Sequence, residues 1–180
     1  MDTNTITKKD TDNIEFQGLI HLKRKYWRLL ESHPFPPAPA SGQIPEMLKY
    51  FKRKSDDFKQ IGHYTNISVF EAANRIATDL VIINGAIQLA EQDQFIMKSK
   101  FTLRLGTRHE KGLGDITIGK YEGEAFNVAP SFLSEKYRRT KRKWLNGRLS
   151  YIFINEEVAE RLPNTDGIIK IIKVKNWNKK

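Results

Sequence analysis

The spacing of apolar positions changes several times along this chain, from helical to strand spacing and back. Between residues 19 and 30 apolar side chains recur every three or four positions, with lysines and arginines between them, which predicts an amphipathic basic helix. Residues 69 to 92 are apolar on most sides, as in a helix buried within a domain. Residues 101 to 105 alternate Phe, Thr, Leu, Arg and Leu, the pattern of a half-buried strand. The chain therefore combines helices with strands.

The second half of the chain continues this mixture. Two short alternating runs, from Asp115 to Ile118 and from Glu124 to Val128, flank a turn rich in glycine and predict a β-hairpin. A strongly basic helix is expected next, capped by Ser131 or Ser134 after a break at Pro130, and ending at Gly147. Apolar runs then predict strands over 149 to 154 and 168 to 175, separated by a short helix from 155 to 162.

The amino-terminal third differs in composition from the rest. Residues 1 to 13 are polar and without periodicity, so we expect a disordered tail. Residues 14 to 66 are expected to form a helical arm, in which the extended segment PFPPAPASG connects the basic helix to a short helix over 46 to 54. Residues 67 to 180 then form the core domain, an α/β fold with a central mixed sheet flanked by helices.

Composition narrows the class of protein. Apolar residues make up 39% of the chain, and 31 Lys and Arg against 21 Asp and Glu give a net charge of +10, which favours a polyanionic partner. The chain has no cysteine, which excludes disulfide frameworks and thiolate metal sites. The start MDTNTITKKDTDN has no apolar segment like that of a signal peptide, and no apolar run is long enough to span a bilayer. We therefore expect a cytoplasmic protein that is not in a membrane.

Two carboxylates on the predicted hairpin are the candidate chemical centre. Side chains alternate faces along a strand, so pairing of the two strands can bring Asp115 and Glu124 to one side. Mg²⁺ prefers oxygen ligands and usually binds proteins through one or two carboxylates. The hairpin therefore predicts a site for Mg²⁺ or Mn²⁺.

The order of these elements resembles the core of the PD-(D/E)XK nuclease superfamily. The resemblance covers roughly residues 67 to 155 and rests on the order α-β-β-β-α-β, with GDITIGKYEGEAF in the place of the superfamily motif. It implies a restriction-endonuclease-like fold, with the carboxylates of Asp115 and Glu124 and the carbonyl of Ala125 as metal ligands. A departure from the motif is that Phe126 stands where the superfamily has a lysine two residues after the glutamate.

Several residues are candidates to complete such a site. Lys136 on the basic helix is the best substitute for the missing lysine, whereas Lys120 is expected to face away from Asp115. Glu71 is a third catalytic acid by resemblance; alternatively, Glu71, Arg75 and Asp79 form a salt-bridge ladder along their helix, because they repeat every four residues.

A second set of residues is expected to contact nucleic acid. The basic helix carries cations that would repel one another unless an anionic backbone neutralised them. His109 is either an acid or base near neutral pH or a solvated loop histidine. The candidates for nucleic-acid contact are Arg104, His109, Arg138, Arg139, Lys141, Arg142 and Lys143. The helix over 19 to 30 offers either another such contact or a solvated outer face.

Two functions follow from this set of residues. The first is a metal-dependent endonuclease that hydrolyses DNA, of the restriction or defence type, with RNA left open as a substrate. Cleavage of both strands would call for a homodimer, and the helix over 69 to 92 or the amino-terminal arm is the expected interface. The alternative is a non-catalytic nucleic-acid-binding protein on a degenerate nuclease scaffold, in which Phe126 marks a lost active site.

Overall fold

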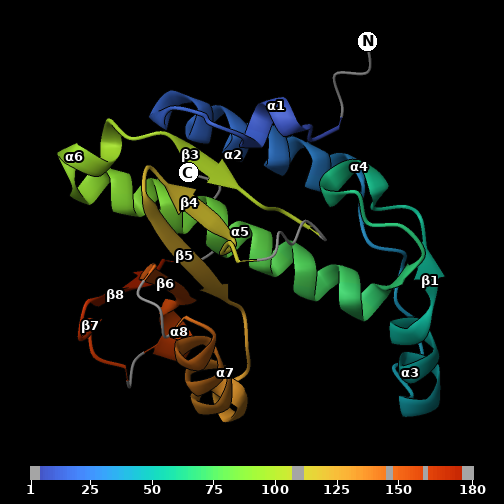
Figure 1. The fold of residues 1–180 in the computed structure, drawn as a ribbon. Coiled ribbons are helices and arrows are strands. Elements are labelled where there is room, and N and C mark those ends of the chain that lie inside the picture. The colour runs from blue at the N-terminus through green and yellow to red at the C-terminus, as the bar shows by residue number, and fades with distance from the viewer. Residues whose placement is uncertain (1–4, 107–111, 145–147, 160–161, 176–180) are drawn as a thin grey trace.

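A six-stranded mixed sheet flanked by helices forms the centre of the molecule (Figure 1). The computed structural model describes residues 5–106, 112–144, 148–159 and 162–175. The sheet has the order β3-β4-β5-β6-β8-β7, with strands β3 (Phe101–Leu103), β4 (Ile116–Ile118), β5 (Tyr121–Phe126), β6 (Leu149–Asn155), β7 (Thr165–Asp166) and β8 (Ile169–Val174). The longer helices are α2 (Phe16–Ser32), α3 (Ile44–Lys52), α5 (Val69–Gln92) and α7 (Pro130–Lys143). The predicted α/β class is confirmed.

The sheet is antiparallel at one end and mostly parallel at the other. Strands β3, β4 and β5 form an antiparallel meander, which confirms the predicted hairpin, and β6 then runs parallel to β5 and to β8. The chain passes through α5, β3, β4, β5, α7 and β6 in that order. This is the predicted succession of a helix, three strands, a helix and a strand.

Helices α2 and α5 cover one face of the sheet. Helix α5 begins where the sequence predicts, because the Ser68 hydroxyl accepts the Glu71 N–H at 3.1 Å and so caps its first turn. Gly85 lets α5 lie close to the sheet, since a Cβ at this position would be 2.4 Å from Cδ1 of Phe153. Most of α5 is enclosed between α2 and the strands. Most of the apolar surface of residues 69 to 92 is thus buried within the chain, with Phe70 an exception at 66% exposed, and a dimer interface on this helix stays a prediction.

Helix α7 and the short helix α8 (Glu156–Ala159) cover the opposite face. A second apolar cluster lies beneath them, built from Phe126, Leu133, Trp144, Leu149, Ile152, Ile154, Ala159, Ile169 and Ile171. Pro130 does not break the chain before α7 but is its first residue, a position where a missing N–H costs nothing. The sheet is thus sandwiched between two helical layers.

The described amino-terminal residues pack against the main core. Residues 5 to 13 are ordered here: α1 (Lys8–Thr11) is helical, the Ile6 side chain is buried, and Ile14 pairs with Phe101 through backbone hydrogen bonds of 2.9 and 2.8 Å. Side chains of α2 belong to the same apolar cluster as those of α5 and the sheet. The described residues of both segments thus contribute apolar side chains to the main core, and the division into a tail, a helical arm and a core domain stays a prediction.

Short elements connect these layers. Strand β1 (Lys54–Ser55) pairs with β2 (Ile67–Ser68) across the predicted domain boundary, α4 (Lys59–Gly62) lies between them, and α6 (Gln94–Met97) follows α5. In the part of the chain that the structure describes, no helix is both long enough and apolar enough to cross a bilayer.

Candidate functional site

A pocket of about 800 Å³ opens between α5, the end of β5 and α7. It is lined by seven residues that the sequence singles out, namely Glu71, Arg104, Asp115, Glu124, Ala125, Lys136 and Lys143. Asn74, Arg75, Thr78, Asp79 and Asn127 are among the other lining residues. Residues from four separate segments of the chain therefore meet at one concave surface.

The strand register explains why Asp115 and Glu124 meet. The last pair of the β4–β5 ladder is Ile116 with Gly123, so the next position sets Asp115 opposite Glu124. The Ala125 N–H donates to Oδ2 of Asp115 at 2.8 Å, which holds this carboxylate against β5. Gly114 permits the close approach, because a Cβ there would lie 2.2 Å from the Gly123 carbonyl oxygen. Asp115 and Glu124 thus share one face of the sheet.

The carboxylate of Glu124 is bound by the end of α7. Its Oε1 accepts from Lys143 Nζ at 2.7 Å and from Trp144 Nε1 at 2.9 Å, and its side chain is only 8% exposed. The end of α7 therefore holds this carboxylate in place at the pocket wall. Lys143 was expected to contact nucleic acid, and that contact stays a prediction; in the structure its ammonium group lines the pocket and pairs with Glu124.

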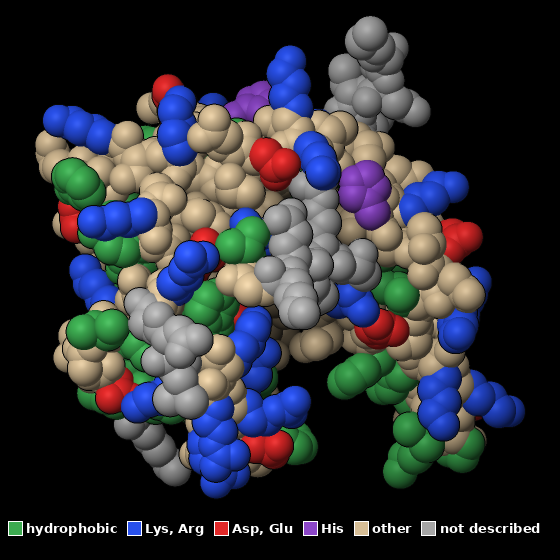
Figure 2. Space-filling model, viewed as in Figure 1, with side chains coloured by type: hydrophobic (Ala, Val, Ile, Leu, Met, Phe, Trp, Pro, Cys, Tyr) green, Lys and Arg blue, Asp and Glu red, His purple; other side chains and the backbone are tan. Residues whose placement is uncertain are grey.

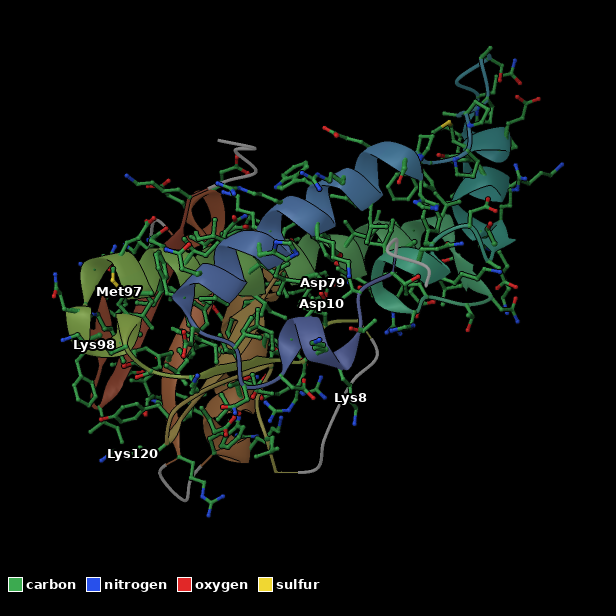
Figure 3. The ribbon with its side chains drawn as sticks, turned by 90° about the horizontal axis from the view of Figure 1, so that it is seen from above. Lys8, Asp10, Asp79, Met97, Lys98 and Lys120 are labelled. Carbon is green, nitrogen blue, oxygen red and sulfur yellow. The ribbon has the colours of Figure 1, made fainter. Side chains whose placement is uncertain are left out.

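Lys136 also reaches the pocket. It lies two helical turns before Lys143, so both side chains project from one face of α7. The Lys136 ammonium nitrogen is 5.4 Å from the centre of the Phe126 ring. The position that departs from the superfamily motif is therefore in contact with a lysine from the following helix. Lys120 does not line the pocket and points outward at the rim of the molecule (Figure 3).

Glu71 lies at the pocket and also pairs along its helix, while its role as a catalytic acid stays a prediction. Its Oε1 accepts from Arg75 Nη2 at 2.6 Å and from Nε at 3.1 Å, so the predicted pair along the helix exists. Both residues also line the pocket. Asp79, the third residue of the expected ladder, instead points to buried partners. Glu71 is therefore an acid at the pocket wall with an arginine beside it.

Asp79 is a buried carboxylate that the sequence did not identify as a site residue. It is 2% exposed, its Oδ2 accepts from the hydroxyls of Tyr26 at 2.7 Å and Tyr64 at 2.5 Å, and its Oδ1 accepts the Gly106 N–H at 2.9 Å. The pKa of Asp79 is raised to about 6, because burial raises it by more than the three donors lower it, and the nearby charge of Asp115 adds to the rise. Figure 3 labels Asp79 on α5, well inside the molecule. The sequence does contain a signal for such a residue, because Asp79 is an acid within a predicted helix that is apolar on most sides.

Arg104 is held in a network of hydrogen bonds at the pocket. It was predicted to contact nucleic acid. In the structure its Nη1 donates to the Gly114 carbonyl at 3.1 Å and to the Thr117 hydroxyl at 2.9 Å, and lies 3.9 Å from Glu122. Glu122 in turn accepts from Gly114 and Thr117. Arg104 is buried in this network, where it joins the strand ends beside Asp115, and it also lines the pocket, so its contact with nucleic acid stays a prediction.

The remaining predicted cations cover the exterior of α7. Arg138, Arg139, Lys141 and Arg142 are exposed, and Figure 2 shows Lys and Arg side chains gathered over this helix. Lys141 pairs with Asp166 at 2.7 Å, while the Arg139–Glu135 contact is long at 4.0 Å. His109, the other candidate, lies outside the described residues. The pocket therefore has a basic outer wall on the α7 side.

The donor set at the pocket suits a hard divalent cation. Within the described ranges, no group of three or more His, Asp or Glu residues is arranged to hold a metal. Mg²⁺ and Mn²⁺ prefer oxygen donors, and Mg²⁺ usually needs only one or two carboxylates, keeping several waters. Asp115, Glu124 and the Ala125 backbone supply oxygens at one wall, and no described residue hydrogen-bonds to Oε2 of Glu124. The residues present therefore fit Mg²⁺ or Mn²⁺.

Comparison with known proteins finds a partial relative. The rhizobactin receptor of Rhizobium meliloti (strain 1021) is 30% identical over 154 residues, which cover 83% of this chain. The chain spans only 19% of the receptor's length, so the match assigns no family. No protein-family model matches the chain. No solved structure matches it either.

Proposed function

We propose that this protein is a metal-dependent endonuclease that hydrolyses phosphodiester bonds in DNA. The observation that carries the proposal is the convergence of Asp115, Glu124, Lys136 and Lys143 at one pocket beside a basic helix. The succession of α5, β3, β4, β5, α7 and β6 around a mixed sheet supports a restriction-endonuclease-like core. The rhizobactin receptor match covers too little of that protein for its function to be carried over.

In this proposal Asp115 and Glu124 hold the ion and the two lysines act on the substrate. A bound Mg²⁺ or Mn²⁺ would polarise the phosphate and lower the pKa of a water molecule bound to it. Lys136 and Lys143 lie on one face of α7, where they can neutralise charge that develops on the phosphate and orient a water. Arg75, already held by Glu71, is placed to contact the scissile strand. The cost of separating Lys143 from Glu124 is offset by the incoming cation.

A nicking assay tests the proposal. Supercoiled plasmid and a single-stranded circle are incubated with the protein in Mg²⁺, in Mn²⁺ and in EDTA. The proposal predicts cleavage in the presence of either ion and none in EDTA. If neither substrate is cut with either ion, or if EDTA has no effect on cleavage, the hydrolytic function is wrong.

Substitution of the pocket lysines is expected to impair cleavage more than binding. Lys136→Met and Lys143→Met should each lower the cleavage rate by about 10²–10³-fold, because each removes a preorganised charge from the reacting phosphate. Lys120→Met is the matched control, since Lys120 carries the same charge at the rim of the molecule, away from the pocket. Single-turnover rates measure the effect, and equal rates in all three variants would show that the α7 lysines do not act in the reaction.

A non-catalytic nucleic-acid-binding protein is the second candidate. The Lys143–Glu124 ion pair favours it, because a lysine already satisfies the carboxylate in the way that a metal ion would. In this case the basic exterior of α7 is the functional surface and metal ions are irrelevant.

The exterior of α7 can be tested by salt dependence. Replacing Arg138, Arg139 and Arg142 together by alanine should weaken oligonucleotide binding. It should also flatten the plot of log affinity against log salt by about 0.7 to 0.9 for each phosphate that the protein no longer neutralises. Fluorescence anisotropy over a range of salt concentrations measures this slope. An unchanged slope would mean that α7 does not contact the backbone in either function.

A further inference from the structure

An exposed aromatic patch lies beside the pocket and has no role in the proposed chemistry. It consists of Tyr50, Phe51 and Phe70, whose rings contact one another in that order at centroid distances of 5.5 and 6.4 Å. Phe51 is 39% exposed and Phe70 is 66% exposed. Phe70 directly precedes Glu71, which lines the pocket. Contiguous exposed apolar patches, unlike single exposed apolar residues, often mark binding sites.

The patch is held in place by the backbone around it. The C-terminal end of α3 leads into β1, which pairs with β2 just before α5, and the Val69 N–H donates to the Arg53 carbonyl at 3.0 Å. The Tyr50 hydroxyl donates to the Pro36 carbonyl at 2.8 Å, which fixes α3 against the proline-rich connection. The position of Phe70 relative to Glu71 is set by the first turn of α5. The patch is therefore a fixed surface at the start of α5, where Phe70 is next in sequence to the pocket residue Glu71.

The patch belongs to the part of the molecule that carries α3 and the start of α5, and a hollow separates this part from a basic wall. In Figure 2 a deep hollow separates the part of the molecule that carries α7 from the part that carries α3. Lys and Arg side chains gather on the α7 side, with some acidic and hydrophobic side chains among them, and hydrophobic side chains lie on the α3 side toward the hollow. The part of the molecule that carries α3 also has Lys and Arg side chains, which Figure 2 shows on its front and outer surfaces. The two walls thus offer different chemistry to whatever binds between them.

A single strand of nucleic acid matches both walls. In a duplex the bases are stacked inside, so two phosphate backbones would face the two walls and the aromatic rings would gain little. A single strand exposes phosphates along one edge and the π-faces of its bases along the other, and proteins bind such strands with a charged groove and aromatic stacking. An apolar protein partner would suit the patch alone but would leave the cations of α7 without neutralisation.

We infer that this hollow binds a single-stranded stretch of nucleic acid, with phosphates along α7 and bases stacked on the patch of Tyr50, Phe51 and Phe70. The assignment of the strand as a substrate rests on the proposed nuclease function, whereas the binding itself does not. A strand held this way passes the pocket, because Phe70 and Glu71 are adjacent on α5 and Lys136 and Lys143 lie on α7. DNA and RNA single strands share this chemistry.

Anisotropy of labelled oligonucleotides tests the inference without metal. Fluorescein-labelled oligothymidylate, oligouridylate and a DNA duplex of the same length are titrated in EDTA with the protein and with Phe51→Ala, Phe70→Ala and Phe95→Ala. Phe95 is the matched control, because it is 72% exposed on α6, away from the patch. All three rings are on the surface, so the variants are expected to fold.

The expected result is tighter binding of the single strands than of the duplex, and a loss of about tenfold in single-strand affinity for Phe70→Ala and for Phe51→Ala, as for one lost stacked base. The Phe95 variant and the duplex should show little change. The ratio of the affinities for oligothymidylate and oligouridylate shows whether the hollow prefers DNA or RNA. Preferential duplex binding, or equal single-strand affinity for all variants, would overturn the inference. So would sedimentation showing that Phe70→Ala only dissociates a dimer. If the Phe51 and Phe70 variants lose single-strand affinity as expected but the nicking assay shows no cleavage, this inference stands and only the nuclease function is removed.

Discussion

Replacing Asp115 by asparagine, or Glu124 by glutamine, is expected to lower metal-dependent cleavage by about 10²–10³-fold or more, because each change removes a charged oxygen ligand. The substitutions preserve shape, and an asparagine amide oxygen can still accept the Ala125 N–H. Binding of single-stranded DNA in EDTA should change little, since neither acid is expected to contact the phosphate backbone of the DNA. Initial cleavage rates at saturating Mn²⁺ measure the first effect, and anisotropy measures the second.

The matched control for this loss is Asp166→Asn. Asp166 accepts from Lys141 on α7, much as Glu124 accepts from Lys143, but it lies outside the pocket. The control should therefore cleave like the parent. Parental rates in both pocket variants would remove the two-carboxylate centre, and a loss in the control of the same size would show that ion pairs to α7, rather than the pocket acids, are limiting.

Removal of the Asp79 side chain is expected to destabilise the fold by about 3–5 kcal/mol, because Asp79→Ala leaves the hydroxyls of Tyr26 and Tyr64 and the Gly106 N–H buried without their acceptor. Urea unfolding near neutral pH measures the loss. The combined variant Asp79→Ala, Tyr26→Phe, Tyr64→Phe removes the stranded hydroxyls as well, so it should recover part of the stability. A loss below about 1 kcal/mol for Asp79→Ala would mean that the network contributes little net stability.

The raised pKa of Asp79 also predicts a pH dependence with a defined sign. The pKa is about 6 in the folded protein against an ordinary value of 3.8, so the folded state binds the proton more tightly than the unfolded state. Asp79 therefore favours folding most below about pH 4, and that contribution, about 3 kcal/mol from the difference between the two pKa values, is lost as pH rises to about 6. In Asp79→Asn this dependence should be absent, and the difference in unfolding free energy between parent and variant measures it. A constant difference across this range would contradict the buried, proton-binding carboxylate.

The sequence predicted the main elements because their patterns are local. Helical spacing of apolar residues located α2 and α5, and Ser68 three residues before Glu71 marked the start of α5. Alternation and the glycine-rich turn located the β4–β5 hairpin, and its register follows from which face is apolar. That register also brings Asp115 opposite Glu124, which is why this part of the pocket could be anticipated from the strands alone.

Long-range partners could not be predicted in the same way. The hydroxyls that hold Asp79 come from Tyr26 and Tyr64, positions 53 and 15 residues away, and nothing in the local pattern of either tyrosine points to an acid. Lys143 was grouped with the outer cations because charge runs usually face solvent, whereas the last turn of α7 directs it to Glu124. Residues 5 to 13 were predicted to be disordered because most of them are polar. A single apolar residue in a polar segment, such as the buried Ile6, gives no periodic pattern that would predict packing.

The most direct test of the central claim is calorimetric titration of Mn²⁺ into the protein and into Asp115→Asn and Asp166→Asn. A two-carboxylate metal site predicts saturable Mn²⁺ binding to the parent and to Asp166→Asn, and its loss or strong weakening in Asp115→Asn, because Asp115 and Glu124 supply the charged oxygens at the pocket. Absence of Mn²⁺ binding to the parent, or equal binding to all three proteins, would contradict it.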